Sequence, residues 1–184
     1  MKTPKRQISF LEAKEIDRII KAIPLEGELN LRDRALLEVL FSTGLRISEA
    51  LALPDAPFIK DEKKTLELSI SGKGGWQRTI YFSPRAIKAV KEHLAARTDN
   101  NILLFPIGSR MAQIMVKKRA AAAGITKRVS PHVFRHSLAT DLLRKGVDIA
   151  FVSRFLGHRS LNNTMIYAHI VSPQLLEIHK KLYK

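Results

Sequence analysis

The feature that most constrains the fold is a change in hydrophobic period along the chain. Apolar residues recur at helical spacing over Leu11–Ile23, whereas they alternate with polar residues over Leu66–Ile70, and a second β-prone run follows at Thr79–Phe82. The glycine-rich segment Ser71–Trp76 joins the two runs and predicts a hairpin. A third, weaker strand is predicted at Phe58–Ile59. We therefore expect a mainly helical α+β domain with a small antiparallel sheet of two to three strands.

Capping residues predict where the remaining helices begin and end. Three Ser-Pro pairs place a cap serine before a proline at the first helical position: Ser83-Pro84, Ser130-Pro131 and Ser172-Pro173. Further candidate caps are Asn30, Ser109 and Asp148, and the candidate helix stops are Gly44, Gly124, Gly146 and Gly157. These positions predict a helix from Asn30 to Gly44, a short helix over Ile47–Leu53, and a second helical half after the sheet.

Composition narrows the class of protein. The chain has 184 residues, of which 45% are hydrophobic, so it has enough apolar material for a packed core and is expected to form a single domain over residues 1–184. It contains no cysteine, no long apolar run and no secretory leader, which favours a soluble cytoplasmic protein. Its net charge of +15 favours a polyanionic partner, but charge alone does not separate DNA, RNA and an acidic membrane surface.

Two positively charged residues occupy positions that the fold does not require. Arg46 lies at a tight corner between two predicted helices, in the stretch Thr43–Leu51. Lys73 lies at the tip of the predicted hairpin, where neighbouring glycines let the backbone approach a ligand. Either residue alone would more often be an ordinary solvated charge.

A third group lies in the first turn of the helix that starts at Pro131. His132 and Arg135 are three residues apart, so they are expected on one face, beside free backbone amides that suit a phosphate. His132 and His136 also have the i, i+4 spacing of metal ligands. Metal binding is disfavoured because valine stands where a zinc protease has glutamate and because Arg135 would repel a cation.

The fourth group is His158 with Tyr167, nine residues further on. Taken singly, His158 would be a helix-capping residue and Tyr167 a half-buried aromatic. Taken with the other three groups, they can surround one phosphodiester. Arginines neutralise its non-bridging oxygens, a histidine assists attack by the tyrosine hydroxyl, and a lysine protonates the departing oxygen. This chemistry requires no metal and no cofactor.

These motifs resemble those of the tyrosine recombinases, the phage integrase family, and especially the Xer-type members. Arg46 in TGLRISEAL matches the first catalytic arginine, and Lys73 in SGKGG matches the hairpin lysine. His132 and Arg135 in PHVFRHSLATDLL match the His-x-x-Arg box, His158 in LGH matches the second histidine, and Tyr167 in NTMIYAHI matches the nucleophile. The resemblance runs from about Leu11 to the C-terminus.

The resemblance implies site-specific recombination of duplex DNA. Tyr167 would attack a scissile phosphate, leaving a 3′-phosphotyrosyl enzyme and a free 5′ hydroxyl, with no metal or cofactor involved. Family members act as a homo-tetramer on two DNA sites, and a C-terminal segment docks into a neighbouring protomer. Ser172–Lys184 is the candidate for that segment, although it can equally pack on its own domain. The family's separate N-terminal DNA-clamping domain is expected to be absent, because the chain begins where the catalytic domain would.

One helix is the best candidate for contact with DNA bases. Family members place the helix that corresponds to Arg110–Ala123 in the major groove. Its polar residues are Arg110, Gln113, Lys117, Lys118 and Arg119, of which the first two are the stronger candidates. A solvated basic face would explain Lys117–Arg119 nearly as well.

Three alternative functions remain at this point. A type IB topoisomerase would need the same residues but no specific DNA site. A non-catalytic DNA-binding module would have no reason to carry Tyr167 and Lys73 so placed. A basic RNA-binding protein is disfavoured because aromatic residues make up only 7% of the chain, too few for a stacking platform.

Overall fold

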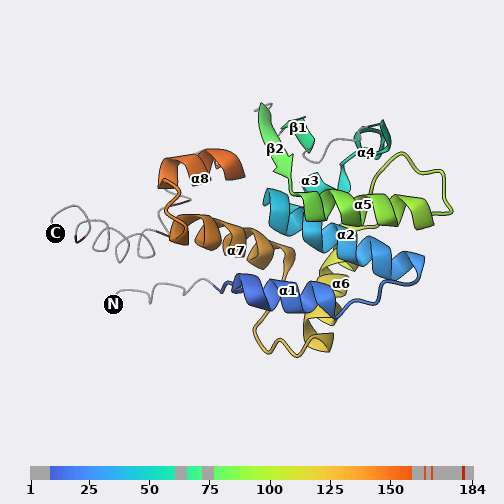
Figure 1. The fold of residues 1–184 in the computed structure, drawn as a ribbon, viewed down its shortest axis with the longest axis horizontal. Coiled ribbons are helices and arrows are strands. Elements are labelled where there is room, and N and C mark those ends of the chain that lie inside the picture. The colour runs from blue at the N-terminus through green and yellow to red at the C-terminus, as the bar shows by residue number, and fades with distance from the viewer. Residues whose placement is uncertain are drawn as a thin grey trace.

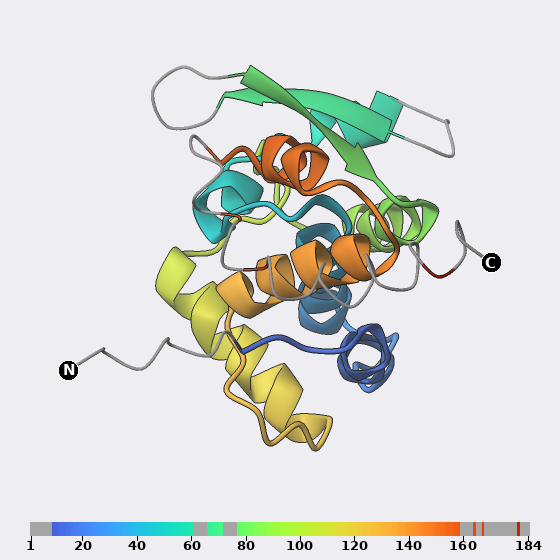
Figure 2. The same ribbon diagram turned by 90° about the vertical axis from the view of Figure 1, so that its left-hand side faces the viewer.

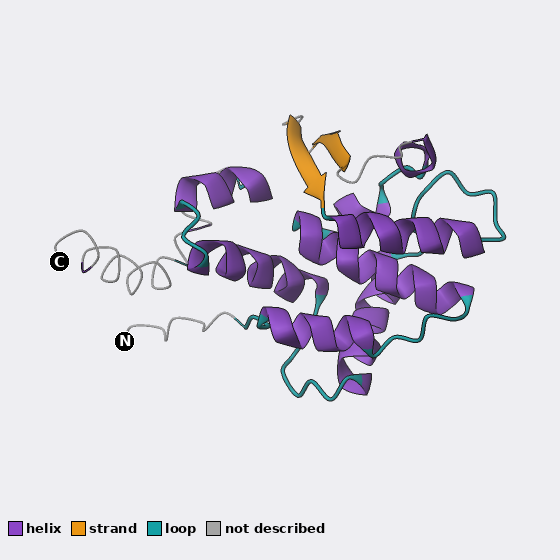
Figure 3. Ribbon diagram, in the orientation of Figure 1, coloured by secondary structure: helices purple, strands orange, loops and turns teal. Residues whose placement is uncertain are grey.

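The protein, seen in a computed structural model, is mainly helical over the residues that the structure describes, which are 9–60, 66–71, 77–158, 164, 167 and 180. In chain order the elements are α1 (Ala13–Lys21), α2 (Glu28–Thr43), α3 (Ile47–Leu51), α4 (Ala56–Lys60), β1 (Leu66–Ser71), β2 (Gln77–Phe82), α5 (Pro84–Ala96), α6 (Ser109–Ala122), α7 (Pro131–Arg144) and α8 (Ile149–Leu156). The predicted α+β class is confirmed (Figure 3).

The long helix α2 lies at the centre of the fold (Figure 1). Helix α5 packs along one side of it, and α1, α6 and α7 contact it from other directions. Consistent with this position, every residue of α2 from Ala35 to Leu40 is buried, and Leu36, Leu37 and Leu40 are fully buried. Each of these leucines contributes about 1.5–3 kcal/mol through burial of its apolar surface.

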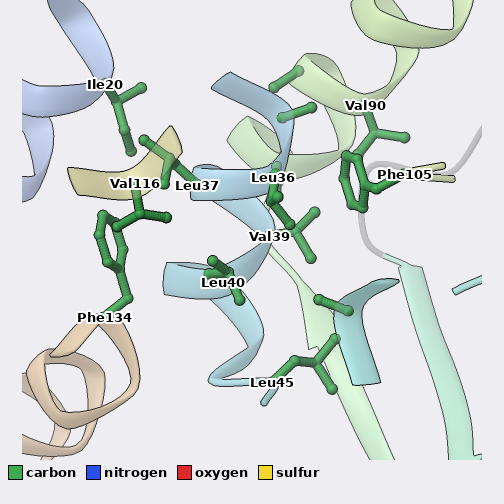
Figure 4. Close-up of a cluster of buried hydrophobic side chains, with 14 of the residues drawn as sticks. Ile20, Leu36, Leu37, Val39, Leu40, Leu45, Val90, Phe105, Val116 and Phe134 are labelled. Atoms are coloured by element: carbon green, nitrogen blue, oxygen red, sulfur yellow. The ribbon is translucent and has the colours of Figure 1, made fainter. Parts of the chain in front are cut away.

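Figure 4 shows how α2 joins the two halves of the core. Leu37 lies on the side of the helix that faces Ile20 and Val116, whereas Leu36 faces Val90 and Phe105. The helices before and after the sheet therefore share one hydrophobic core. This core fixes the end of α2, which leads into Arg46, and helix α7, which carries Arg135.

The sheet consists of two antiparallel strands, in which Leu66 pairs with Phe82 and Leu68 with Ile80. It lies across one end of the molecule, with α8 beneath it (Figure 2). Ile80 and Phe82 are buried on its inner face, and Phe82 packs edge-to-face against Phe58 at a centroid distance of 5.0 Å. The predicted hairpin strands are confirmed.

The predicted third strand at Phe58–Ile59 is wrong, because these residues belong to the short helix α4. The amide of Phe58 donates to the carbonyl of Asp55, which closes a helical turn. Pro57 favours this outcome, since its fixed φ suits the first turn of a helix and it has no N–H for a strand ladder.

Helix caps are confirmed at some predicted positions and corrected at others. Ser83 and Asp148 accept hydrogen bonds from the first-turn amides of α5 and α8, as expected. Asn30 is not a cap, because α2 starts at Glu28 behind Gly27, and the Asn30 side chain instead donates to the carbonyl of Glu26. Ser109 is the first residue of α6, and Gly108 takes the cap position.

Within the described ranges, no helix is long and apolar enough to cross a membrane.

Candidate active site

Arg46 is held at the corner between α2 and α3. Gly44 ends α2 in the left-handed conformation, with a φ of 62°, and a Cβ added there would lie 2.6 Å from the Leu156 side chain. Two residues later, the amide of Arg46 donates to Oε2 of Glu49 at 2.8 Å, which caps α3. The Arg46 guanidinium touches Oε1 of Glu49 at 3.1 Å, and 39% of its side chain stays exposed. Part of this cation is therefore available to a ligand.

Arg135 is a buried residue of α7 and lies close enough to Arg46 for their charges to interact. Its two terminal nitrogens donate to the carbonyls of Gly44 and Leu156, each at 2.5 Å, so it joins the ends of α2 and α8. Burial, followed by the nearby charge of Arg46, lowers the pKa of Arg135 to about 10. The group is still cationic at neutral pH and is fixed before any ligand arrives.

His158 follows the last turn of α8 and lies beside the same arginines. Gly157 ends the helix with a φ of 67°, and the Nδ1 atom of His158 is 2.7 Å from the hydroxyl of Thr164. Burial, together with the charges of Arg135 and Arg46, lowers the pKa of His158 to about 4. This histidine is therefore neutral at physiological pH and can accept a proton or donate a hydrogen bond.

Tyr167 is buried against α7 and α8, with 1% of its surface exposed. Its hydroxyl pairs with Nδ1 of His136, one turn beyond His132. Burial raises the pKa of Tyr167 to about 12, although the positive charge of Arg135 acts in the opposite direction. In this arrangement the hydroxyl holds its proton at neutral pH. Burial and the charges of His132 and Arg135 lower the pKa of His136.

The two residues predicted to share the first-turn face of α7 differ in their exposure. Arg135 is buried, whereas His132 is exposed at the first turn of α7. Lys73 lies between β1 and β2, outside the described residues, and so does Ser172–Lys184 apart from Lys180. Arg46, Arg135, His158 and Tyr167 come close enough for the arginines to shift the other groups' pKa values. Their catalytic roles remain predictions.

Helix α6 presents the predicted DNA-contacting residues to solvent. Arg110, Gln113, Lys117 and Lys118 are all exposed along it. Arg119 differs, because it turns inward and pairs with Asp33 at 2.7 Å, so its place in the basic face is corrected. The base contacts of the other four remain predictions.

Three residues of the site were missed or given another role from the sequence. Arg78 forms a two-point ion pair with Glu49, at 2.8 and 3.1 Å, and no sequence motif indicates that these two residues meet. Glu49 lies three residues after Arg46, the spacing of a capping box, and this could have pointed to it. His136 was considered only as a metal ligand, yet it holds the Tyr167 hydroxyl.

The cluster carries a positive charge that suits a phosphate group. Among the described residues, Arg46, Arg78 and Arg135 share one carboxylate, that of Glu49, so this part of the cluster has a net charge of about +2 from three arginines and one glutamate. Among the described residues, no group of His, Asp and Glu side chains is arranged to hold a metal ion. A pocket of about 710 Å³ lies elsewhere, between α4, α5 and the loop near Ile102, and it contains none of the site residues.

The chain is similar to a known protein family and to several of its members. Residues 9–172 match the phage integrase family. The chain is 39% identical over 183 residues to tyrosine recombinase XerD of Corynebacterium glutamicum, covering 91% of this chain and 59% of that protein. It is 32% identical to tyrosine recombinase XerC of Listeria welshimeri, covering 94% and 61%. The chain thus spans about three fifths of the length of these relatives.

Solved structures show the same fold. XerA recombinase superposes with a TM-score of 0.76 at 27% identity, covering 98% of this chain and 67% of that one. XerH site-specific recombinase, in a post-cleavage complex with its palindromic difH substrate, gives a TM-score of 0.78 at 28% identity, covering 96% and 54%. The catalytic domain of bacteriophage HP1 integrase gives 0.63 at 22% identity, covering 95% of both chains.

Proposed function

The chain belongs to the phage integrase family and resembles its Xer-type tyrosine recombinases, and on that basis we propose that it cleaves and rejoins duplex DNA in site-specific recombination. The observation that carries the proposal is the cationic cluster of Arg46, Arg78 and Arg135, which combines a partly exposed arginine with a buried tyrosine close to Arg135. XerH, a relative in fold, is bound to a DNA substrate in its structure.

In the proposed reaction, the Tyr167 oxygen attacks the scissile phosphorus and the bond from phosphorus to the 5′ oxygen breaks. The product is a 3′-phosphotyrosyl bond, and the departing 5′ oxygen takes up a proton, for which Lys73 is the proposed donor. Rejoining reverses these steps with a 5′ hydroxyl from the partner duplex. The phosphotyrosyl bond conserves the energy of the phosphodiester.

The arginines have distinct parts in this scheme. Arg46, which is half open to solvent, binds the non-bridging oxygens directly. Arg135 is fixed by two carbonyls and adds its charge from behind, where low solvent access strengthens the attraction. His132 and His158 complete the set around the phosphate, and His158 is neutral and can hydrogen-bond an oxygen.

Tyr167 has to change its environment for this reaction. Its hydroxyl pairs with His136 and its pKa is raised to about 12, so it is a poor nucleophile as it stands. Closer contact with the positive charges of Arg46 and Arg135 would favour its ionised form. His136, which is paired with the Tyr167 hydroxyl, can accept its proton when that oxygen attacks the phosphorus.

The proposal also includes how the protein binds DNA and how its copies assemble. The exposed residues of α6 would enter the major groove, with Arg110 and Gln113 contacting base edges and Lys117 and Lys118 contacting phosphates. Residues 1–184 would act as one catalytic domain. Four copies would assemble on two DNA sites, with Ser172–Lys184 docking on a neighbouring protomer.

Covalent trapping tests the proposal. The probe is a duplex selected for binding from a random-sequence library, nicked one nucleotide from the candidate scissile phosphate so that the cleaved fragment diffuses away. We expect a band that survives denaturation with the wild-type chain and with Tyr81→Phe, a change on the sheet, and no band with Tyr167→Phe. An equal band with Tyr167→Phe contradicts the proposal. Relaxation of plasmids that lack the selected sequence would indicate a topoisomerase.

A further inference from the structure

Arg78 is a largely buried cation in the cluster, and the proposed reaction does not explain its role. It is the second residue of β2, opposite Ile70 in the register, and only 11% of its side chain is exposed. The strand follows directly on the segment that carries Lys73. Arg78 therefore ties the hairpin to the corner that holds Arg46.

The carboxylate of Glu49 is fully engaged by two arginines. Arg78 donates to Oε1 at 3.1 Å and to Oε2 at 2.8 Å, which is a bidentate pair. Arg46 donates its backbone amide to Oε2 and one terminal nitrogen to Oε1. A carboxylate has about four acceptor positions, so these four hydrogen bonds leave none open.

This sharing limits how far Glu49 can neutralise Arg46. Arg46 meets the carboxylate through one side-chain nitrogen, its guanidinium has no other hydrogen-bond partner among the described residues, and 39% of its side chain is exposed. If Arg78 were removed, two acceptor positions would become free within reach of Arg46. A bidentate pair would then form, which is the stronger arrangement and would occupy the edge that a phosphate needs.

Arg78 also contacts the other side of the site. A Cβ added at Gly157 would lie 2.8 Å from both Cδ and Nη1 of Arg78, so the glycine makes room for this side chain. Gly157 directly precedes His158, and the charge of Arg78 is one of the causes of the lowered His158 pKa. Arg78 thus lies between the Arg46 corner and the end of α8.

We propose that Arg78 is a positioning residue that holds Glu49 so that Arg46 stays free for the scissile phosphate. The role rests on the proposed DNA-cleaving function, and it acts through Glu49 rather than by contact with DNA. It also makes the active state of Arg46 depend on the placement of the hairpin strand that follows Lys73.

A double-mutant cycle tests the role on the nicked duplex described above. Arg78→Ala should lower the rate of adduct formation about 100-fold, while the Kd for the duplex changes less than about threefold. Arg78→Lys, which keeps the charge but occupies one oxygen, should recover part of the rate. Arg34→Ala, which breaks an ion pair with Glu92 outside the site, is the matched control and should leave the rate within about threefold of wild type.

Glu49→Gln supplies the decisive arm of the cycle. It removes the charge that would capture Arg46, so adding it to Arg78→Ala should raise the rate about tenfold above that of Arg78→Ala alone. A double variant no faster than Arg78→Ala would overturn the proposal, because the loss would then not pass through Glu49.

A measurement without DNA keeps the proposal separate from the proposed function. Phenylglyoxal modifies accessible arginines, and mass spectrometry reports the extent at each position. Arg46 should react about threefold more slowly in Arg78→Ala than in wild type, because a bidentate pair shields it. Arg110, exposed on α6, is the internal reference and should react equally in both. An unchanged or faster reaction of Arg46 overturns the proposal even if no DNA adduct ever forms.

Discussion

Two carboxylates in this protein each lie between two arginines, and they are used differently. Arg32 donates to Oδ1 of Asp33 through its Nε and one terminal nitrogen. Arg119 donates to Oδ2 through the same two kinds of nitrogen. Glu49 receives a bidentate pair from Arg78 and only one terminal side-chain nitrogen from Arg46. The first centre commits both guanidinium groups, whereas the second leaves one of them partly uncommitted.

Exposure separates the two centres in the same way. The side chains of Arg32 and Arg119 are 17% and 19% exposed, and Arg119 also donates to Asn30. Arg46 is 39% exposed. The Asp33 centre fastens α2 to α6, and the Glu49 centre presents a cation to a ligand. A pair of arginines around a buried carboxylate therefore does not by itself indicate a functional site, and what distinguishes the site is a guanidinium with donors left uncommitted.

The largest effect is expected when the charge of Asp33 is removed. Asp33 is buried, and Asp33→Asn leaves two guanidinium groups, each less than a fifth exposed, without their shared counter-charge, so the free energy of unfolding should fall by about 3–5 kcal/mol. Glu49→Gln should cost less, about 2–3 kcal/mol, because only Arg78 is then left largely buried without its counter-charge, whereas Arg46 can turn to water. Chemical denaturation of both variants measures the difference. Equal losses would show that the two centres do not differ in this way.

Two arginine variants, one from each centre, should differ in whether they lower the rate of adduct formation or the free energy of unfolding. Arg46→Ala should slow adduct formation by about 10²–10³, which is the cost of losing one donor to the transition-state oxyanion. Its free energy of unfolding should change by less than about 1 kcal/mol. Arg32→Ala should destabilise the fold by about 1–2 kcal/mol and leave the rate within a few-fold, since Asp33 keeps its second partner.

The comparison breaks down if both variants lose activity in proportion to their stability. In that case Arg46 would be a structural residue like Arg32. Measuring the rate of adduct formation and the free energy of unfolding on the same preparations separates these outcomes.

The smallest effect is expected in the pH dependence of stability. Burial and the arginines of the site lower the pKa of His158 from 6.5 to about 4, so the stability that neutral His158 contributes is present above pH 6.5 and lost as the pH falls towards 4. Between pH 7.5 and 5, wild type should lose about 1 kcal/mol more than His158→Gln, a value reduced for partial solvation. Denaturant titrations at the two pH values measure this. A pH-independent difference between the chains would contradict the assigned environment of His158.

The sequence predicted most of the fold because its information is local there. The period change located β1 and β2, and Gly44 and Gly157 ended helices where expected. The wrong third strand arose because Phe58 and Ile59 are β-prone, while the helical turn depends on Pro57 and Asp55 around them.

The site was only partly predictable because many of its contacts join residues that are far apart in the sequence. Arg46, Arg135, His158 and Tyr167 stand in ordered motifs that the chain itself displays. The partners that set their state come from other elements, and such contacts depend on how the helices pack. Arg78 meets Glu49 across 29 residues of sequence, and Arg119 meets Asp33 across 86. Neither pairing has a local pattern, which explains why Arg119 was grouped with the surface charges.

The most direct test is to identify the residue that becomes joined to DNA. The trapped adduct is digested with nuclease and trypsin, and the peptide that retains a nucleotide is sequenced by mass spectrometry. The proposed reaction predicts a nucleotide attached through its 3′ phosphate to Tyr167. Attachment at Tyr81, at Tyr183 or at another side chain, or a linkage through a 5′ phosphate, would contradict it.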